Sequence, residues 1–433
     1  MTTFLGIDAG TSGCRCCVID ADGVPLAWSR QALAPPVRRG NASEQDPQSW
    51  WNALIASLDD LGAYTDLSDI EAVCIDATSS TLLLCDAAGK PCTPALMYND
   101  ARATTEAATI SRMAPPESAA HGPGASLAKL LWLLDTPDAG QACRALHQAD
   151  WLTGCLSGRF DISDENNALK LGYDPVQRRW PDWLGPLDLP AGMLPAVVPA
   201  GQTIGQLTAE SCQRWGFSPG TRMVSGTTDS TASTIATGAG PGDAVTTLGS
   251  TLVLKVFAER PVFAPAAGVY SHRLGDHWLA GGASNTGGAV LQQFFSEAEI
   301  SRYSKQLRPD HPTGLDYYPL PAPGERFPVN DPGLQPRLSP RPADDVQFFQ
   351  AILEGITAVE VRGYRLLAEL GAPLPSRILS AGGGAANTAW RVMREHALGV
   401  PVIAARQQEA AYGAAQLALR STPLPEQQGG PAN

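Results

Sequence analysis

The sequence predicts an α/β protein built from two related halves, and two observations support this. First, two similar strand-turn-strand stretches occur, one in each half: LGIDAGTSGCRCCVID at residues 5–20 and AVTTLGSTLVLKVFA at residues 244–258. Each has an apolar run, a turn rich in Gly, Ser and Thr, and a second apolar run. Second, strands and helices alternate after each stretch, which is typical of layered α/β folds. We therefore expect two related domains, each presenting its turn to a cleft between them.

The turn in residues 5–20 has the chemistry of a phosphate site. Asp8 ends the first strand, Gly10 and Gly13 give the turn its backbone freedom, and Thr11 and Ser12 lie at its tip. A carboxylate beside such a tip can hold hydrated Mg²⁺ while backbone N–H groups face phosphate oxygens. Taken alone, the stretch also fits a plain hairpin capped by Asp8. The second copy in residues 244–258 favours the phosphate-binding interpretation.

Composition narrows the class of protein. The chain has 433 residues, enough for two domains of about 200 residues each. A hydrophobic content of 44% with 17% charged residues argues against disorder. The net charge of −12, without a Lys/Arg cluster, predicts no nucleic-acid partner. No apolar run approaches the roughly 18 residues of a membrane span, so no membrane partner is expected.

The cysteines and histidines predict neither a zinc site nor a redox site. Cys14 and Cys17 form a C-x-x-C pair, but alternation along a strand would send them to opposite faces. None of the six histidines stands in a metal-ligand spacing. Nine cysteines in a chain with no apparent signal peptide indicate reduced thiols and a cytoplasmic protein.

The first half contains two expected helices and a further strand-turn-strand stretch. A helix over residues 47–61 begins after Asp46, a plausible N-cap. The stretch 70–84 reads as strand, turn, strand, with hydroxyl-rich residues 76–80 in the turn. Residues 126–134 form an amphipathic helix, in which we expect Lys129 to be solvated and Trp132 to face the core.

Asp229 ends a strand over residues 222–228 and precedes a helix of small residues. A helix N-terminus favours the ionised form of a carboxyl group. Asp is also a common N-cap, so the position alone does not distinguish a catalytic from a structural role.

The glycine-rich loop 238–243 predicts the domain boundary, giving domains at 1–238 and 239–420 and a disordered tail at 421–433. In the second half, we expect residues 308–343 to be a long surface excursion and residues 344–370 a helix. A strand at 377–380 leads into three glycines, then Asn387 and a helix over 388–396. Glycines between strand and helix allow a nucleotide to approach the backbone closely.

Together these stretches resemble the FGGY carbohydrate kinases. In this chain, GIDAGTSG (6–13) resembles the family's first phosphate motif and TTLGST (246–251) resembles its second. LSAGGGAANTAW (379–390) resembles the family's adenosine motif. SLAKLLWL (126–133) and LEGI (353–356) resemble the two signature regions. The resemblance implies two actin/hexokinase-like (ribonuclease H-like) domains with an ATP/sugar cleft between them.

Within that family the chain looks most like the short D-ribulose kinases of cyanobacteria and plants. Ser250 stands where most family members have Thr, and these relatives share that Ser. Residues 100–125 depart more from the pattern, which affects the sugar pocket. The matching stretches are DATSSTLLLCD (76–86), ADWL (149–152), NALKLGYD (167–174), GTTDS (226–230), LGSTLVLK (248–255), GVYSH (268–272), GGASN (281–285) and GLDYYPLPAPGERFP (314–328).

The resemblance also implies roles for single residues. Asp229 would be the general base for the sugar's terminal hydroxyl, and Asp8 would organise Mg²⁺ and the transferring phosphoryl group. The residues expected to touch the sugar are Asp8, Ser12, Ser79 and Asp229. The residues expected to hold ATP are Thr11, Ser12, Gly249, Ser250, Gly383, Gly384 and Asn387. The implied reaction is ATP-dependent phosphorylation of D-ribulose to D-ribulose 5-phosphate.

Several alternatives stay open at this point. D-xylulose or another ketose or polyol is a near alternative, because these acceptors differ from D-ribulose at one or two hydroxyls. A non-catalytic sugar or nucleotide sensor on the same fold is another. The presence of both Asp8 and Asp229 argues against a sensor, which needs no base. A chaperone-like ATPase would require a further peptide-binding domain. The oligomeric state is not predicted.

Overall fold

The computed structural model describes residues 2–421, which divide into two compact units. The first unit holds the chain up to Pro115, then Ala120–Ala236 and the chain from Glu409. The second holds Pro116–Ala119 and Thr237–Gln408. We had assigned residues 409–420 to the second domain, but in the structure they pack within the first unit. Apart from Ser421, the tail that we expected to be disordered lies outside the described residues.

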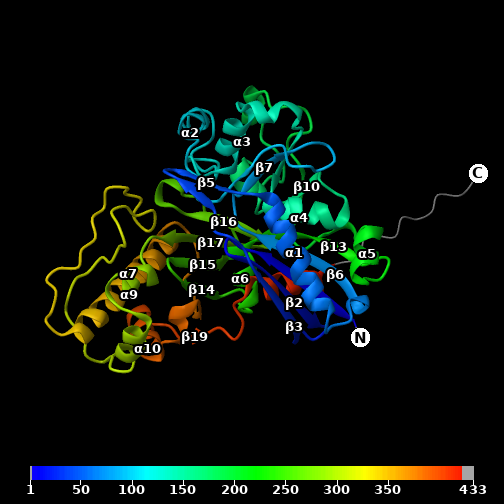
Figure 1. The fold of residues 1–433 in the computed structure, drawn as a ribbon. Coiled ribbons are helices and arrows are strands. Elements are labelled where there is room, and N and C mark those ends of the chain that lie inside the picture. The colour runs from blue at the N-terminus through cyan, green and yellow to red at the C-terminus, as the bar shows by residue number, and fades with distance from the viewer. Residues whose placement is uncertain (1, 422–433) are drawn as a thin grey trace, which may run out of the picture. The chain divides into compact units, whose positions relative to one another are not determined.

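The first unit is built on a six-stranded sheet in the order β12-β13-β6-β1-β2-β3 (Figure 1). β1, β2 and β3 form an antiparallel meander, β6 runs parallel to β1, and β13 runs parallel to β6. The hairpin predicted from residues 5–20 is thus confirmed. The strands are β1 Thr3–Ala9, β2 Gly13–Asp20, β3 Pro25–Ala32, β6 Ile70–Ala77, β12 Thr203–Gln206 and β13 Arg222–Thr228.

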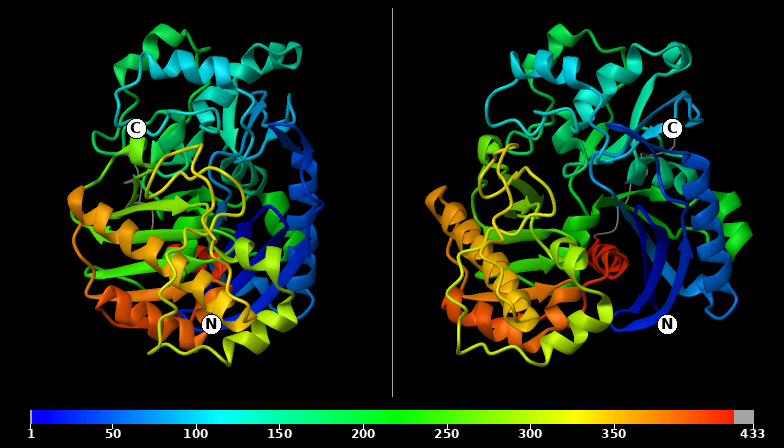
Figure 2. Two further views of the ribbon diagram at one scale, coloured as in Figure 1. Left: turned by 90° about the vertical axis from the view of Figure 1, so that its left-hand side faces the viewer. Right: turned by 60° about the vertical axis from the view of Figure 1, so that its left-hand side comes forward.

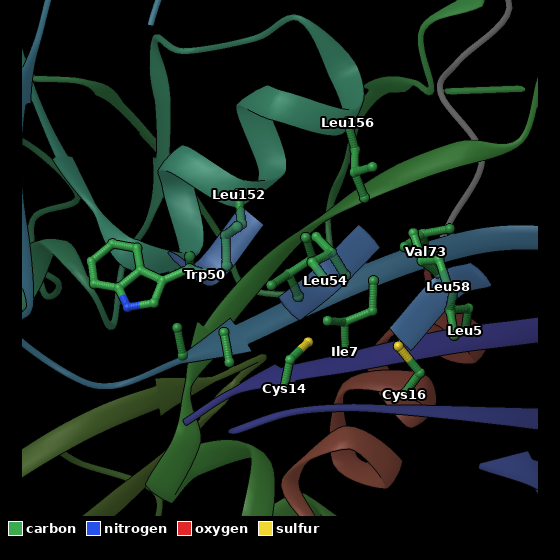
Figure 3. Close-up of a cluster of buried hydrophobic side chains, with 14 of the residues drawn as sticks. Leu5, Ile7, Cys14, Cys16, Trp50, Leu54, Leu58, Val73, Leu152 and Leu156 are labelled. Carbon is green, nitrogen blue, oxygen red and sulfur yellow. The ribbon is translucent and has the colours of Figure 1, made fainter. Parts of the chain in front are cut away.

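Helices α1 (Pro47–Gly62) and α4 (Gln148–Ser157) supply apolar side chains to the core of this sheet. Figure 3 shows Leu54 and Leu58 of α1 near Leu5 and Ile7 of β1. α1 begins as predicted, because the Asp46 side chain accepts a hydrogen bond from the backbone N–H of Gln48.

The helices α11 (Ala410–Arg420) and α6 (Asp229–Ala236) pack together, and α11 also lies against β1. The approach of α11 is close, since a Cβ at Gly6 would lie 2.0 Å from the Ala411 carbonyl oxygen. Only glycine fits at that position of β1. This contact fixes α11, the last helix among residues 2–421, against the strand that carries Asp8.

A smaller layer of the first unit contains a five-stranded sheet in the order β4-β5-β8-β7-β9. Lys129 of α3 is fully buried there, so our expectation that it is solvated was wrong. Trp132 is only half-buried and stacks on Arg102, with the guanidinium carbon 4.7 Å from the ring centroid. The elements are β4 Val37–Arg39, β5 Ala42–Gln45, β7 Leu82–Cys85, β8 Ala95–Leu96, β9 Arg144–His147, α2 Thr104–Ser111 and α3 Ser126–Leu134. Elsewhere in the first unit, β10 Ile162–Asp164 pairs in parallel with β11 Ala196–Val198, and α5 Ala209–Trp215 packs on α1.

The second unit repeats the pattern of the first with a sheet in the order β16-β17-β15-β14-β18-β19. β14, β15, β17 and β16 pair antiparallel, while β18 runs parallel to β14 and β19 parallel to β18. The hairpin predicted from residues 244–258 is therefore also confirmed. The strands are β14 Asp243–Leu248, β15 Leu252–Ala258, β16 Tyr270–Leu274, β17 His277–Ser284, β18 Arg377–Ala381 and β19 Val402–Ala404.

The long helix α9 (Asp345–Glu369), orange in Figure 2, packs on β15, β17 and α10 (Thr388–Leu398). Two short helices, α7 (Gly288–Phe294) and α8 (Glu297–Ser304), complete the unit. Residues 308–343 run as loops, yellow in Figure 2, but they are more than a surface excursion. Tyr317, Leu320 and Phe327 are buried in the core of this unit. None of the helices within residues 2–421 has the length and apolar character needed to cross a membrane.

Candidate functional site

Three acidic residues lie at the carboxyl ends of adjacent parallel strands in the first unit. Asp8 of β1 stands opposite Asp76 of β6, and Asp76 stands opposite Thr227 of β13. Asp229 follows directly after the end of β13. Side chains opposite each other in a parallel register point to the same face of the sheet. The fold therefore gathers carboxylates from three distant parts of the chain at one edge.

The sequence analysis placed Asp76 in the hydroxyl-rich turn 76–80 but gave it no role of its own. A signal was present, because β1 and β6 both end in Ile-Asp-Ala, at residues 7–9 and 75–77. That repeat becomes informative only once the two strands are known to pair in parallel and in this register.

The Asp76 carboxyl group is strongly perturbed. It is fully buried, and neither oxygen accepts a hydrogen bond from an N–H or hydroxyl donor among the described residues. Burial, followed by the nearby carboxylates of Asp8 and Asp229, raises the pKa of Asp76 well above its ordinary value. A buried carboxyl group without a donor is costly, which makes this edge of the sheet a candidate functional site.

Asp8 has a cationic neighbour that the sequence analysis also missed. Arg15 of β2 stands opposite Asp8 in the hairpin, and its Nη1 donates to Asp8 Oδ2 at 2.7 Å. Burial raises the pKa of Asp8, while the Arg15 guanidinium opposes that shift. The signal was the length of the turn, since a three-residue connection between Ala9 and Gly13 sets the register that pairs the two residues.

The acidic edge fits a Mg²⁺ ion. Asp8 and Asp76 place two carboxyl groups side by side, and Asp76 has oxygens without donors. Among residues 2–421, no group of three His, Cys, Asp or Glu side chains is arranged to hold a metal alone. Mg²⁺ suits such a site, because it keeps several waters and commonly takes one or two carboxylates together with substrate phosphates.

Asp229 is the first residue of α6, and its Oδ1 accepts from the backbone N–H of Ser230 at 2.6 Å. One carboxylate oxygen thus engages the helix N-terminus, as the sequence suggested. The Asp229 carboxyl group lies at the same sheet edge as Asp8 and Asp76.

The predicted hydroxyl residues of the first unit lie in the turns beside this edge. Thr11 and Ser12 occupy the turn between β1 and β2, which is closed by a hydrogen bond from Gly10 N to Gly13 O at 3.0 Å. Thr11 is half-buried and Ser12 is exposed. Ser79 lies half-buried in the turn after β6.

The second unit contains a cavity of about 980 Å³, lined by all five of its residues that we expected to hold ATP. These are Gly249, Ser250, Gly383, Gly384 and Asn387. The volume is at the upper end for a small-molecule site. Its wall combines the β14-β15 turn, helices α7 and α8, and the start of α10.

The glycine loop of this cavity is held in place from two sides. Gly382 has a φ of +82°, and a Cβ there would lie 2.5 Å from the Leu248 carbonyl oxygen. Asn387 caps α10 by accepting from Trp390 N, and its amide donates to Ser304 of α8 at 2.9 Å. The loop is therefore pre-formed against both the β14-β15 turn and α8.

A buried ion pair anchors the helix that follows the loop. Arg394 of α10 donates to both oxygens of Glu360 of α9 at 2.7 Å, and to Ser380 Oγ at 2.6 Å. Both charged side chains are almost completely excluded from solvent. Thr246 of β14 also donates to Glu360 at 2.6 Å, so one network joins β14, β18, α9 and α10.

Two protein-family models match the chain, and the second also covers α11, which packs within the first unit. Residues 3–236 match the model of the FGGY family of carbohydrate kinases, N-terminal domain, and residues 244–422 match its C-terminal domain. The chain belongs to the FGGY family of carbohydrate kinases. It is a carbohydrate kinase with the family's two-domain α/β fold, as the sequence resemblance implied.

The curated relatives of this FGGY kinase include two xylulose kinases. The one from Escherichia coli (strain K12) is 27% identical over 414 residues, covering 90% of this chain and 84% of the relative. The one from Streptomyces coelicolor is 28% identical over 414 residues, covering 92% and 83%.

Solved structures show the same fold. A xyloylose kinase from Brucella ovis superposes with a TM-score of 0.88 at 25% identity, covering 96% of this chain and 90% of that one. A gluconate kinase from Lactobacillus acidophilus reaches a TM-score of 0.86 at 19% identity, with 96% and 88% covered.

Proposed function

We propose that this FGGY kinase transfers the γ-phosphoryl group of ATP to the terminal hydroxyl of a ketopentose, with D-ribulose as the preferred acceptor. The observation that carries the proposal is the acidic sheet edge, where Asp8, Asp76 and Asp229 follow three neighbouring parallel strands. A binding protein for a neutral sugar has no need of three carboxyl groups at one edge, whereas phosphoryl transfer needs a base and a metal site.

In this proposal Asp229 is the general base. It accepts the proton of the terminal hydroxyl while the sugar oxygen forms a bond to the γ-phosphorus. The bond from that phosphorus to the β-γ bridging oxygen breaks, and ADP leaves with the electron pair. The N–H groups at the start of α6 favour the ionised carboxylate that this step needs.

The remaining residues position the reactants. Backbone N–H groups around Gly249, Ser250 and Gly383 would face the phosphates. The part of the cavity lined by Asn387 would take the nucleoside. Asp8 and Asp76 would hold Mg²⁺, which neutralises phosphate charge when it is bound. Arg15 keeps Asp8 in place and adds positive charge beside the expected phosphate turn.

Two acceptors are in competition. D-ribulose is favoured by the stretches of this sequence that resemble D-ribulose kinases, including Ser250 in LGST. D-xylulose is favoured by the names of the curated relatives. The two sugars differ in the configuration of one carbon, so a few contacts beside Ser79 and Asp229 would decide between them.

The test is ADP release in a coupled assay with ATP and Mg²⁺. The acceptors are D-ribulose, D-xylulose, L-ribulose, ribitol and glycerol, and the variant is Asp229→Asn. This substitution keeps the size and the hydrogen bond to Ser230 N but removes the base, so we expect turnover to fall by about 10²–10⁴-fold.

Each outcome has a defined meaning. Turnover of D-ribulose at the highest kcat/KM, lost in Asp229→Asn, supports the proposal. A higher kcat/KM for D-xylulose would make D-xylulose the preferred acceptor and leave the proposed mechanism unchanged. No turnover of any ketopentose by a protein that binds ATP would overturn the proposal. Activity that survives in Asp229→Asn would assign the base to another residue.

A further inference from the structure

Lys129 is an unusual residue, because it is completely buried and both of its hydrogen bonds go to backbone carbonyls. Its Nζ donates to Ser80 O at 2.8 Å and to Met97 O at 2.7 Å. Burial lowers the pKa of Lys129 to about 7, with a smaller contribution from Lys170 that Asp100 opposes. A lysine buried against carbonyls costs stability relative to an apolar side chain of the same length, so its contacts deserve a functional explanation.

The two carbonyls belong to two separate loops of the first unit. Ser80 lies in the turn after β6, next to Ser79, and has a φ of +65°, which is uncommon for a residue with a side chain. Met97 begins the loop that follows β8, where its carbonyl also accepts from Asp100 N at 2.9 Å. The Lys129 Nζ thus joins the turn that carries Ser79 to the loop that carries Asp100.

Ser126 and Trp132, three residues before and after Lys129 on α3, also contact segments around these two loops. Ser126 Oγ contacts His147 Nε2 at 3.0 Å, and Trp132 stacks on Arg102. Arg102 in turn donates to Asp100 Oδ2 at 2.7 Å. Residues spaced by three lie on one face of a helix, so a single face of α3 braces three segments.

We infer that Lys129 is a positioning residue for sugar binding: it clamps the Ser79–Ser80 turn to the Met97–Arg102 loop and thereby sets where Ser79 meets the acceptor. This inference rests on the proposed function, in which Ser79 contacts the sugar. Lys129 does not touch the substrate in this account. It acts through the backbone of Ser80, which an apolar residue of the same size could not hold.

The main test compares Lys129→Met with Lys129→Gln. Met fills nearly the same space without a donor, whereas Gln keeps two N–H donors on a shorter side chain. In Lys129→Met we expect KM for the sugar to rise at least tenfold, while KM for ATP changes less than twofold. Lys129→Gln should recover part of the loss. Lys90→Met, at an exposed lysine of the same unit, is the matched control.

A double-variant comparison tests whether Lys129 acts through Ser79. If it does, Ser79→Ala combined with Lys129→Met should lower kcat/KM for the sugar no further than the worse single variant. Fully additive losses would overturn the inference. So would a folded Lys129→Met whose sugar KM stays within twofold of the parent protein.

A readout without catalysis separates this inference from the proposed function. Hydrogen exchange of peptides covering residues 78–82 and 97–101 should accelerate at least tenfold in Lys129→Met and by less in Lys129→Gln, with exchange in β14 and β15 unchanged. If no sugar is phosphorylated yet these peptides are loosened, the clamp stands and the proposed function fails. Unchanged exchange in both variants would overturn the clamp whatever the activity.

Discussion

The buried Lys129 predicts that the stability of this kinase rises with pH above neutrality, and that Lys129→Met removes most of that rise. Burial lowers the pKa of the group from its ordinary value of 10.5 to about 7. Between those two pH values the unfolded chain binds a proton that the folded chain lacks. Stability therefore increases with pH across this window, and the penalty from Lys129 is largest below pH 7.

The size of the effect follows from the shift. A difference of 3.5 units between the two pKa values corresponds to a full penalty of about 5 kcal/mol below pH 7. Between pH 7.5 and 9.5 the linkage relation gives a change of about 2–3 kcal/mol in the free energy of unfolding. Losing the hydrogen bonds to Ser80 O and Met97 O also destabilises Lys129→Met, but that loss does not depend on pH.

The assay is urea unfolding followed by circular dichroism at pH 7.5 and 9.5, for the parent protein, Lys129→Met and the exposed-site control Lys90→Met. The quantity of interest is the difference between the two pH values, compared among proteins, because thiols and other groups titrate equally in all three. On going from pH 7.5 to 9.5, the free energy of unfolding of the parent protein and of Lys90→Met should rise by about 2–3 kcal/mol more than that of Lys129→Met. An equal gain in all three proteins would refute the lowered pKa.

Three further predictions concern packing and the nucleotide cavity. Arg394→Met leaves Glu360 buried without its partner, so the free energy of unfolding should fall by about 3–5 kcal/mol in urea titrations; adding Glu360→Leu should recover part of it, and a further loss would contradict the reasoning. Gly6→Ala places a Cβ 2.0 Å from the Ala411 carbonyl oxygen, so β1 and α11 must move apart and the free energy of unfolding should fall by about 1–3 kcal/mol or more. An unchanged midpoint of thermal unfolding would disprove that contact. At Gly383, where a Cβ meets open space, Gly383→Leu should raise the Kd for ATP at least tenfold with stability unchanged; undiminished ATP binding by calorimetry would place the nucleotide elsewhere.

Much of the fold was predictable because its signals are local. Both hairpins were located from their apolar runs and glycine turns, the cap of α1 from Asp46, and the extent of α9 from the expected helix over 344–370. Patterns of this kind depend only on neighbouring residues, so tertiary context rarely changes them. The residues Gly249, Gly383 and Asn387, which the sequence analysis grouped together, line one cavity.

The errors have a common origin in contacts between distant segments. Lys129 was expected in solvent because charged side chains on an amphipathic helix are usually exposed, and no local pattern reveals two carbonyls from residues 80 and 97. The loops at 308–343 were expected on the surface from their proline and glycine content. Their buried Tyr317 and Phe327 belong to a core assembled from other parts of the second unit.

The sequence by itself determined the family, the two-domain α/β class, and the turns with Asp8 and Asp229, because these depend on short ordered motifs. Only the tertiary structure decided which groups surround them. Asp76 is adjacent to Asp8 because β6 pairs in parallel with β1, and Arg15 meets Asp8 because the hairpin register allows it. Strand pairing and burial between distant residues set the charges and pKa values of the site. A local stretch of sequence reveals neither the strand pairing nor the burial.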